Sequence, residues 1–399
     1  MSVWVDLQGQ EPVVAQLRRA AQSPNPTHAW LITGPPGSGR SNAARAFAAA
    51  LVCEREELAE RGCGVCHACH TTLAGTNADV TFVATDKTTI AIDEARELVV
   101  KAQDRPSSSR WRVMIVGDAD RMSERTTNVL LKAIEEPPPR TIWILCTPSP
   151  ADVLVTIRSR CRAVSLRLPP VRDVAALLVR RDGIEPALAL QAARAAQSHV
   201  GIARRLARDA GARERRDAIV RLPLTLRDVT SAVTAAGSLM ELATAEATSS
   251  NDERDAAEKA ELLRNLGAPE TGTLPPALRA QIRALEEDQK RRAKRSVTDM
   301  LDRALTDLLS FYRDALVLQL AARPGPAVVV HEDNHGPVEL VPVELVNEPL
   351  RAQLGEYAAR SRPEATLARM AAVNDTRRRI TTTNVAPLLA LEAMAAGLL

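Results

Sequence analysis

The stretch GPPGSGRS at residues 34–41 constrains the fold of this chain most, because it nearly matches the phosphate-binding pattern G-x-x-x-x-G-K-[ST]. An apolar run, HAWLIT at residues 28–33, leads into it, and an Ala-rich helical stretch over residues 41–52 follows. This order places backbone N–H groups at a helix N-terminus, where they can hold phosphate. The sequence therefore predicts an α/β fold with a P-loop-type parallel sheet. The candidate nucleotide-binding residues of the loop are Gly34, Pro35, Pro36, Gly37, Ser38, Gly39, Arg40 and Ser41.

Two positions depart from what nucleotide hydrolysis requires. Arg40 stands where the pattern has Lys, and its wide planar guanidinium differs from a compact ammonium. The apolar run at 112–118 ends in Asp118, a candidate metal contact, but Ala119 follows where a water-activating Glu belongs. A missing general base costs about 10²–10⁴ in rate. We therefore expect no hydrolysis, and the residues leave open whether the loop serves structure alone or binds ATP with Mg²⁺ through Ser41.

The first part of the chain alternates between strand and helix patterns, which favours a parallel sheet flanked by helices. Strands are expected at 81–85, 112–120 and 141–147, and helices at 12–21, 92–102 and 123–135.

The chain beyond residue 168 reads as helical. Short helices are expected over 171–210, a polar helical region over 213–264 with a Ser-Ser-Asn-Asp break at 249–252, a long helix pair over 278–320, and helices at 348–359 and 363–376. Loops are expected at 266–277 and 328–341. We divide the chain into an α/β domain (1–167) and two helical parts (168–212 and 213–399).

Four cysteines form the strongest isolated motif, and their spacing suits a tetrahedral thiolate site for Zn²⁺. They are Cys53, Cys63, Cys66 and Cys69, separated by nine, two and two residues. His67 and His70 could substitute as ligands, although four thiolates already fill such a site. The alternative is the haem-attachment pattern C-x-x-C-H at residues 63–67, which needs export and leaves Cys53 and Cys69 unexplained.

The stretch TIRSRCR at 156–162 allows two interpretations. An Arg on a helix end can reach a γ-phosphate bound by a neighbouring subunit, as arginine fingers do. Three closely spaced Arg residues are also typical of a solvated surface. The residues alone do not decide between them.

Taken together, several segments resemble the bacterial sliding-clamp-loader subunits of the AAA+ class. They are GPPGSGRS, the four-cysteine insertion, NVLLKAIEEPPPRTIWILCTPSP (128–150) and TIRSRCR, in this order. The resemblance covers residues 4–205 well and is weaker beyond them. It implies that Arg160 acts in trans as an arginine finger, that Thr147 stands at the first sensor position, and that Arg204 in GIAR (201–204) is the second-sensor Arg. It also implies an ATPase-like domain over residues 1–167 with a zinc module at 53–69, a helical lid over 168–212, and a helical oligomerisation domain or collar over 213–399.

The departures at Arg40 and Ala119 look like those of the delta-prime type, the stator of the DNA polymerase III clamp loader. This resemblance implies a non-hydrolysing subunit of the DNA polymerase III holoenzyme. Its partners would be the gamma/tau ATPase and delta subunits, the sliding clamp, and primed DNA reached through the complex.

Two other functions stay open. One is an active gamma/tau-type ATPase that tolerates Arg40. The other is a nucleic-acid-binding module using the basic runs KRRAKR (290–295) and RRR (377–379), although aromatic residues make up only 2% of the chain and the net charge is +3. The N-terminus lacks a signal-peptide pattern and no apolar run is long enough to cross a membrane, so we expect a cytoplasmic protein without membrane partners.

Overall fold

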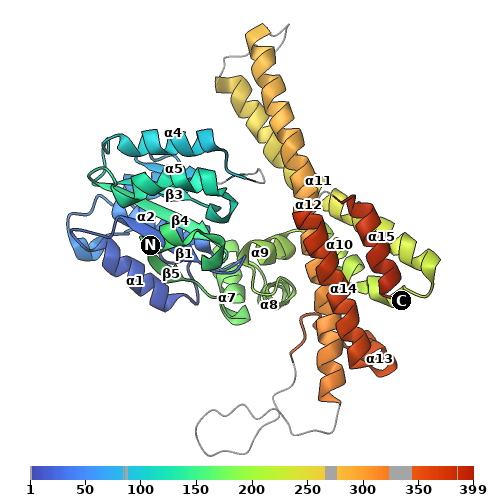
Figure 1. Ribbon diagram of the computed structural model, residues 1–399. Helices are drawn as coiled ribbons and strands as arrows, with labels where there is room; N and C mark the ends of the chain where they lie inside the picture. Colours follow the sequence, from blue (N-terminus) through green and yellow to red (C-terminus); the bar gives the residue numbers. More distant parts are fainter. Residues whose placement is uncertain (1, 84, 86–88, 266–275, 323–343, 384) are drawn as a thin grey trace, which may run out of the picture. The chain divides into compact units, whose positions relative to one another are not determined.

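The computed structural model of this chain describes residues 2–83, 85, 89–265, 276–322, 344–383 and 385–399. It consists of two compact units, Met1–Arg208 and Asp209–Leu399 (Figure 1). The helices over 171–208 belong to the first unit together with the sheet. The finer division into three domains stays a prediction.

The first unit is built on a five-stranded parallel sheet in the order β2-β3-β4-β1-β5. The strands are β1 (Ala29–Thr33), β2 (Val80–Val83), β3 (Arg112–Val116), β4 (Thr141–Thr147) and β5 (Arg162–Ser165). Every residue of β1, β3 and β4 is buried, as expected for a parallel sheet with both faces covered. The α/β fold class with a parallel sheet is confirmed.

Helices cover the two faces of this sheet (Figure 1). α1 (Glu11–Ala21) and α2 (Arg40–Leu51) pack on the face that carries Trp30 and Ile144. α4 (Ile92–Gln103) and α5 (Glu124–Glu135) pack on the opposite face. The remaining helices of the unit are α3 (His67–Ala74), α6 (Val155–Arg158), α7 (Val171–Asp182), α8 (Pro186–Ala195) and α9 (Val200–Arg208).

The edge strand β5 was not predicted from the sequence. It has four residues, of which Val164 alone is buried, so it lacks the apolar run that marks the central strands. The strand expected at 112–120 ends earlier, at Val116, and Asp118 lies in the turn that follows.

The second unit is helical. It contains α10 (Ala210–Arg221), α11 (Val229–Asn265), α12 (Pro276–Ala321), α13 (Arg351–Arg360), α14 (Pro363–Thr382) and α15 (Pro387–Gly397). Figure 1 shows α11 and α12 side by side, and α12 also packs against α14.

Two predictions for this unit were wrong. The Ser-Ser-Asn-Asp stretch at 249–252 does not interrupt α11, because these residues lower helix propensity only slightly and Ala243 and Ala247 are buried in the packed helix just before them. Residues 278–320 form one helix rather than a pair, and this stretch contains no Gly or Pro to end it. Of the expected loops, 328–341 and most of 266–277 lie outside the described residues, while Pro276 and Ala277 begin α12.

A buried carboxylate on α12 fixes the segment that precedes α13. Asp314 is fully buried and accepts hydrogen bonds from the backbone N–H groups of Val346 (3.1 Å) and Asn347 (2.7 Å). Its oxygens also accept from the Asn347 side-chain amide (3.0 Å) and from Arg313 (2.7 Å). The charge of Asp314 is thereby compensated inside the unit.

No described helix combines the length and the apolar character that crossing a membrane requires.

Candidate functional site

The Gly-rich loop lies at the carboxyl edge of the sheet, as the strand–loop–helix pattern predicted. β1 ends at Thr33, immediately before Gly34, and Thr33 is in register with Thr147 at the end of β4. The Gly34 N–H donates to the carbonyl of Pro148 (3.3 Å). Thr147 is fully buried and its hydroxyl donates to the Ser149 carbonyl (3.1 Å). The structure therefore brings the loop and Thr147 together.

Two glycines give the loop its shape. Gly37 has φ +87° and Gly39 has φ +90°, both in the left-handed region that favours glycine. Gly39 caps α2, and its carbonyl accepts from the Ala43 N–H (2.8 Å). The N-terminus of α2 therefore begins in the loop, as in a phosphate-binding site. Ser41, in the first turn of α2, is exposed.

Arg40 is turned back onto its own loop. Its Nη1 donates to the carbonyl oxygen of Gly34. Burial lowers the pKa of Arg40, and the nearby carboxylates Asp118 and Asp120 act in the opposite direction. Asp118 accepts from the Thr85 N–H (3.2 Å). The guanidinium thus already has a hydrogen-bond acceptor and two anionic neighbours within the chain.

The acidic pair after β3 is not arranged as a metal contact followed by a base. Ala119 is buried between Asp118 and Asp120. Burial raises the pKa of Asp120, and the charge of Asp118 acts in the same direction. Asp120 therefore offers a carboxyl group one position later in the sequence than the Glu that hydrolysis requires.

His199, which the sequence motifs did not indicate, packs directly on the loop. A Cβ atom at Gly37 would lie only 2.6 Å from His199 Cγ, so glycine is required there for space as well as for φ. The Nδ1 atom of His199 accepts from the Ile202 N–H (3.3 Å) at the start of α9. The helical part of the first unit therefore contacts the loop.

Gln10 is a second residue that the motifs missed. It is 2% exposed, and its side-chain amide donates to the carbonyls of Ser38 (3.4 Å) and Arg167. It thereby joins the loop to the segment that follows β5. Since these contacts span 28 and 157 positions, no local pattern could have revealed them.

Arg204 contacts α7 in this structure. Its Nη2 and Nε lie 2.7 Å and 2.9 Å from Asp182 Oδ1. Burial of Asp182 opposes its ionisation, but the hydrogen bonds and charges of Arg204 and Arg181 outweigh burial and lower the pKa of this carboxyl. The second-sensor role of Arg204 stays a prediction.

The four cysteines converge as their spacing predicted, with all Sγ atoms within 4.8 Å of one another. Cys53 Sγ lies 3.7 Å from Cys63 Sγ and 3.9 Å from Cys66 Sγ. These distances are too long for disulfides and match the separation of roughly 3.8 Å between sulfurs of a tetrahedral site with metal–sulfur bonds of about 2.3 Å. His67 and His70 are exposed and lie outside the cluster. The cluster could therefore hold a metal ion.

Local hydrogen bonds lower the pKa of one of these cysteines, whereas burial raises the pKa of Cys66 and Cys69. Burial alone would raise the pKa of Cys63, but N–H groups of Val65 and Cys66 donate to its sulfur and lower the pKa to about 6. The Cys69 N–H donates to Cys66 Sγ (3.4 Å) at the start of α3. Such N–H···S bonds favour thiolates, the form that binds metal.

The three Arg residues of TIRSRCR have different environments. Arg158 ends α6 and donates to the Pro150 carbonyl (3.3 Å), while Arg162 begins β5 and lies over the Trp30 ring at 5.1 Å. Arg160 donates from Nη1 to the Thr156 carbonyl (2.7 Å) and the Ser159 hydroxyl (3.3 Å). Its Nη2 forms an ion pair with Glu135. Arg160 is thus held in an exposed turn by groups of its own chain.

The family match lies within this first unit. Residues 9–170 match the family model described as "DNA polymerase III, delta subunit". The DNA polymerase III gamma/tau subunit of Mycobacterium tuberculosis is 38% identical over 178 residues, which cover 44% of this chain and 31% of that protein. The delta-prime subunit of Escherichia coli is 34% identical over 172 residues, covering 41% and 51%. Residues 9–170 are therefore similar to clamp-loader subunits of the gamma/tau and delta-prime type.

The chain matches only part of the length of these relatives. The matches span about a third of the gamma/tau relative and about half of the delta-prime relative. Among solved structures, a gamma subunit-related protein of Thermotoga maritima is 16% identical, with coverage of 73% of this chain and 98% of that chain and a TM-score of 0.33. The resemblance to clamp-loader subunits is confirmed by the family model over residues 9–170 and by these relatives over 172–178 residues.

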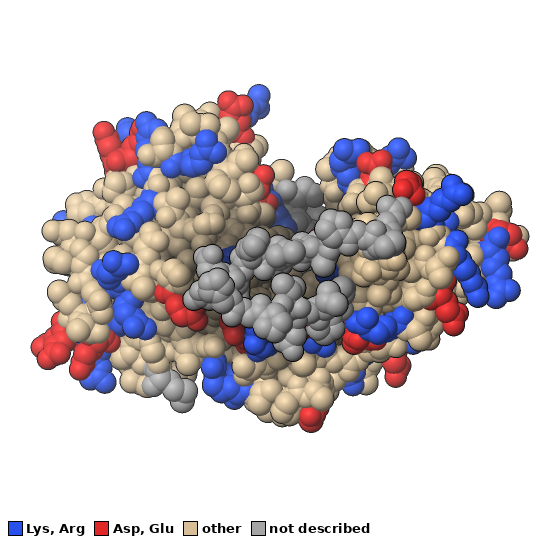
Figure 2. All heavy atoms as spheres, turned by 90° about the horizontal axis from the view of Figure 1, so that it is seen from below, with Lys and Arg blue, Asp and Glu red and all other residues tan. Residues whose placement is uncertain are grey.

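The basic runs in the second unit do not form a described cationic site. Arg377 makes a two-point ion pair with Asp302 (2.9 and 3.0 Å), and Arg378 pairs with Asp375 (2.9 Å). Most side chains of the 290–295 run lie outside the description. On the face drawn in Figure 2, described basic and acidic side chains are interspersed. The ion pairs favour a salt-bridged surface at Arg377 and Arg378.

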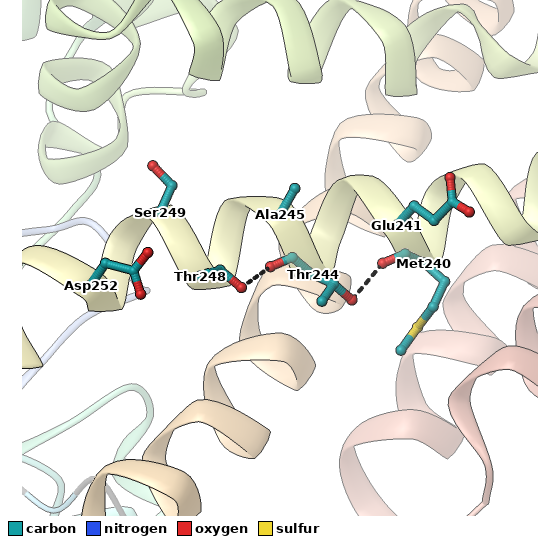
Figure 3. A pocket seen from close by; sticks show the side chains of 7 residues that line it. All are labelled: Met240, Glu241, Thr244, Ala245, Thr248, Ser249 and Asp252. Atoms are coloured by element: carbon teal, nitrogen blue, oxygen red, sulfur yellow. Dashed lines mark hydrogen bonds between the residues drawn. The ribbon is translucent and has the colours of Figure 1, made fainter. Parts of the chain in front are cut away.

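A hollow in the second unit also lacks the features of a ligand site. Its seven lining residues all come from one face of α11 (Figure 3). The Thr244 and Thr248 hydroxyls donate to carbonyls of their own helix (2.8 and 3.0 Å). The two acidic residues, Glu241 and Asp252, stand eleven positions apart, about 16 Å along a helix. Its polar groups therefore do not converge.

Proposed function

We propose that this chain is a delta-prime-type stator of a DNA polymerase III clamp loader. In this proposal it does not hydrolyse nucleotide and lends Arg160 to ATP bound by a neighbouring gamma/tau-type subunit. Delta, the sliding clamp and primed DNA would be its other partners, the last two reached through the complex. The hydrogen bond from Arg40 to the Gly34 carbonyl carries the proposal, because it turns the loop's cation away from any bound phosphate.

Two further observations support the absence of turnover. Ala119 removes the expected general base, which corresponds to about 10²–10⁴ in rate. His199 packs on Gly37, so the helical part of the unit occupies one side of the loop.

The exposed turn at Arg160 supports the second half of the proposal. Its side chain is 38% exposed, and its guanidinium can donate several parallel hydrogen bonds to phosphate oxygens. A group of this kind, supplied in trans, accelerates phosphoryl transfer by roughly 10³–10⁵. Of the three Arg residues, Arg160 alone stands in the Ser159-Arg160-Cys161 motif to which the family resemblance gives the finger role. We therefore assign the role to Arg160.

We also propose that the cysteine cluster holds Zn²⁺. Four thiolates complete the tetrahedral coordination of this ion and leave no position for water or substrate. The ion would link α3 to Cys53, just beyond the end of α2, and would have no catalytic part. Its contribution would be to the folding of the first unit.

The identity to gamma/tau relatives favours a second candidate, an active loader ATPase that tolerates Arg40. The residue that opposes it is Ala119. Robust ATP hydrolysis by the isolated chain that disappears in Ser41→Ala would favour this second candidate over the stator.

The test of the stator role is a reconstituted loader with gamma/tau-type and delta subunits. Arg160→Ala should assemble normally and slow ATP-dependent clamp loading at least about tenfold. Arg160→Lys should rescue poorly, because ammonium keeps the charge but loses the planar fork. Arg158→Ala, a loss of the same group two residues away, is the matched control. An Arg160→Ala complex that loads clamps at the wild-type rate would refute the finger role.

A further inference from the structure

The ion pair between Arg160 and Glu135 joins two segments that are 25 positions apart. Glu135 is the last residue of α5, and its neighbour Ile134 is fully buried in the same core as Ile157 of α6. The adjacent Glu136 leaves the helical region (φ −122°, ψ 67°) because Pro137 follows it. The position of Glu135 is therefore set by the end of a packed helix.

Three acceptors surround the Arg160 guanidinium, and one of them is charged. Nη1 donates to the Thr156 carbonyl and the Ser159 hydroxyl, and Nη2 forms the ion pair with the Glu135 carboxylate. The first two acceptors belong to the turn itself. Of the three acceptors, only Glu135 carries a negative charge, as a phosphate oxygen would, and it contacts Nη2.

We propose that Glu135 is the resting partner of Arg160 and competes with the neighbour's γ-phosphate for its guanidinium. This inference rests on the finger role proposed above. In the free chain the carboxylate keeps the guanidinium in the turn, and on assembly a phosphate oxygen replaces the carboxylate oxygen at Nη2. Glu135 is then a positioning residue that sets how readily Arg160 binds the neighbour's γ-phosphate.

The exchange is energetically accessible. The two side chains are 38% and 41% exposed, and solvent-exposed ion pairs are weak. Glu135 also stands at the C-terminal end of α5, where the helix dipole disfavours an anion. A γ-phosphate carries more charge and several oxygens, so it can displace a single carboxylate oxygen.

Steady-state ATP hydrolysis and clamp loading by the reconstituted loader test the competition. Glu135→Gln should lower the half-saturating ATP concentration roughly two- to fivefold, the range open to an exposed pair, and leave the maximal rate unchanged. Glu135→Asp should stay close to wild type. Glu136→Gln is the matched control, because Glu136 is also exposed at the helix end and has no ion pair among the described residues. In an Arg160→Ala background, Glu135→Gln should have no effect.

A second measurement uses the chain without its partners. Arg160 should react faster with phenylglyoxal, a guanidine-directed reagent, in Glu135→Gln than in wild type or Glu136→Gln, as read by peptide mass spectrometry. Equal reactivity in all three would overturn the resting pair. Suppose that Arg160→Ala slows clamp loading but Glu135→Gln leaves the half-saturating ATP concentration unchanged. This result would overturn the competition and leave the finger role standing. An Arg160→Ala complex with full activity would refute both.

Discussion

Asp79 provides a sharp quantitative test of how the first unit is held together. It is fully buried next to β2, and its carboxylate accepts the N–H groups of Ser107, Ser108 and Ser109 at 2.6, 2.9 and 2.8 Å. The Ser108 hydroxyl adds a fourth bond (3.2 Å). Burial alone would raise the pKa of Asp79, but these hydrogen bonds outweigh burial and lower the pKa to about 2.

The shift converts into a stability with a defined pH window. An unfolded Asp has a pKa near 3.8, so the folded state binds the proton less tightly. At 1.36 kcal/mol for each pKa unit, this difference corresponds to roughly 2–3 kcal/mol of folding free energy. Because the folded pKa is the lower one, the contribution is fully present above pH 4 and is lost as the pH falls toward 2. Asp79→Asn should therefore cost about 2–3 kcal/mol at pH 7.

Tryptophan fluorescence makes the measurement specific to this unit. All four tryptophans lie in it, at Trp4, Trp30, Trp111 and Trp143. Urea unfolding followed by this signal should give the stability difference between wild type and Asp79→Asn, and that difference should shrink between pH 4 and pH 2. Loss of a metal in acid affects both proteins alike and cancels. Asp93→Asn is the control, because Asp93 is exposed. This substitution should lower the free energy of unfolding by less than about 1 kcal/mol.

The reasoning would be refuted by a loss below about 1 kcal/mol at pH 7, since the hydrogen bonds would then not hold the ionised form. It would also be refuted by a difference that does not change with pH.

Other predictions concern the two proposed sites and the second unit. The isolated chain should show no ATP turnover, and Arg40→Lys should not restore it because Ala119 supplies no base; measurable turnover in either protein would contradict this. Elemental analysis should find about one zinc per chain, and Cys66→Ser should lower this content and the urea midpoint of the tryptophan signal; metal-free wild-type protein prepared without chelators would count against the site. Asp314→Asn should destabilise the second unit by about 2–4 kcal/mol, measured by circular dichroism, because three donors from residues 346–347 and Arg313 lose a charged acceptor; an unchanged transition would show that the network is dispensable.

The sequence was sufficient where the determining signal is local. The apolar runs of β1, β3 and β4 are buried on both faces, and the cysteine spacing brings four sulfurs together. It failed where packing decides the outcome. Nothing near residues 249–252 reveals that α11 continues through them, and β5 has a single buried residue.

The same contrast holds for the candidate site. The loop, Asp118 and Thr147 lie at one sheet edge, because parallel strands end together there, and their roles toward a nucleotide stay predictions. Gln10, Glu135 and His199 were missed, since each acts through a partner far away in the sequence. Such contacts are products of the tertiary fold and leave no motif.

The parallel pairing of β5 with β1 has a geometric consequence for Arg160. The loop follows the carboxyl end of β1, whereas Arg160 precedes the amino end of β5, so the two lie at opposite edges of one sheet. Glu135 is at the amino edge too, because α5 returns there before β4 begins. A strand of this length separates the edges by about 13 Å, and the ladder from Trp30 to Ser165 keeps that separation fixed. Under the proposed function, this guanidinium would lie too far from the loop of its own chain to reach a phosphate bound there, and the phosphate it meets would belong to a neighbouring subunit.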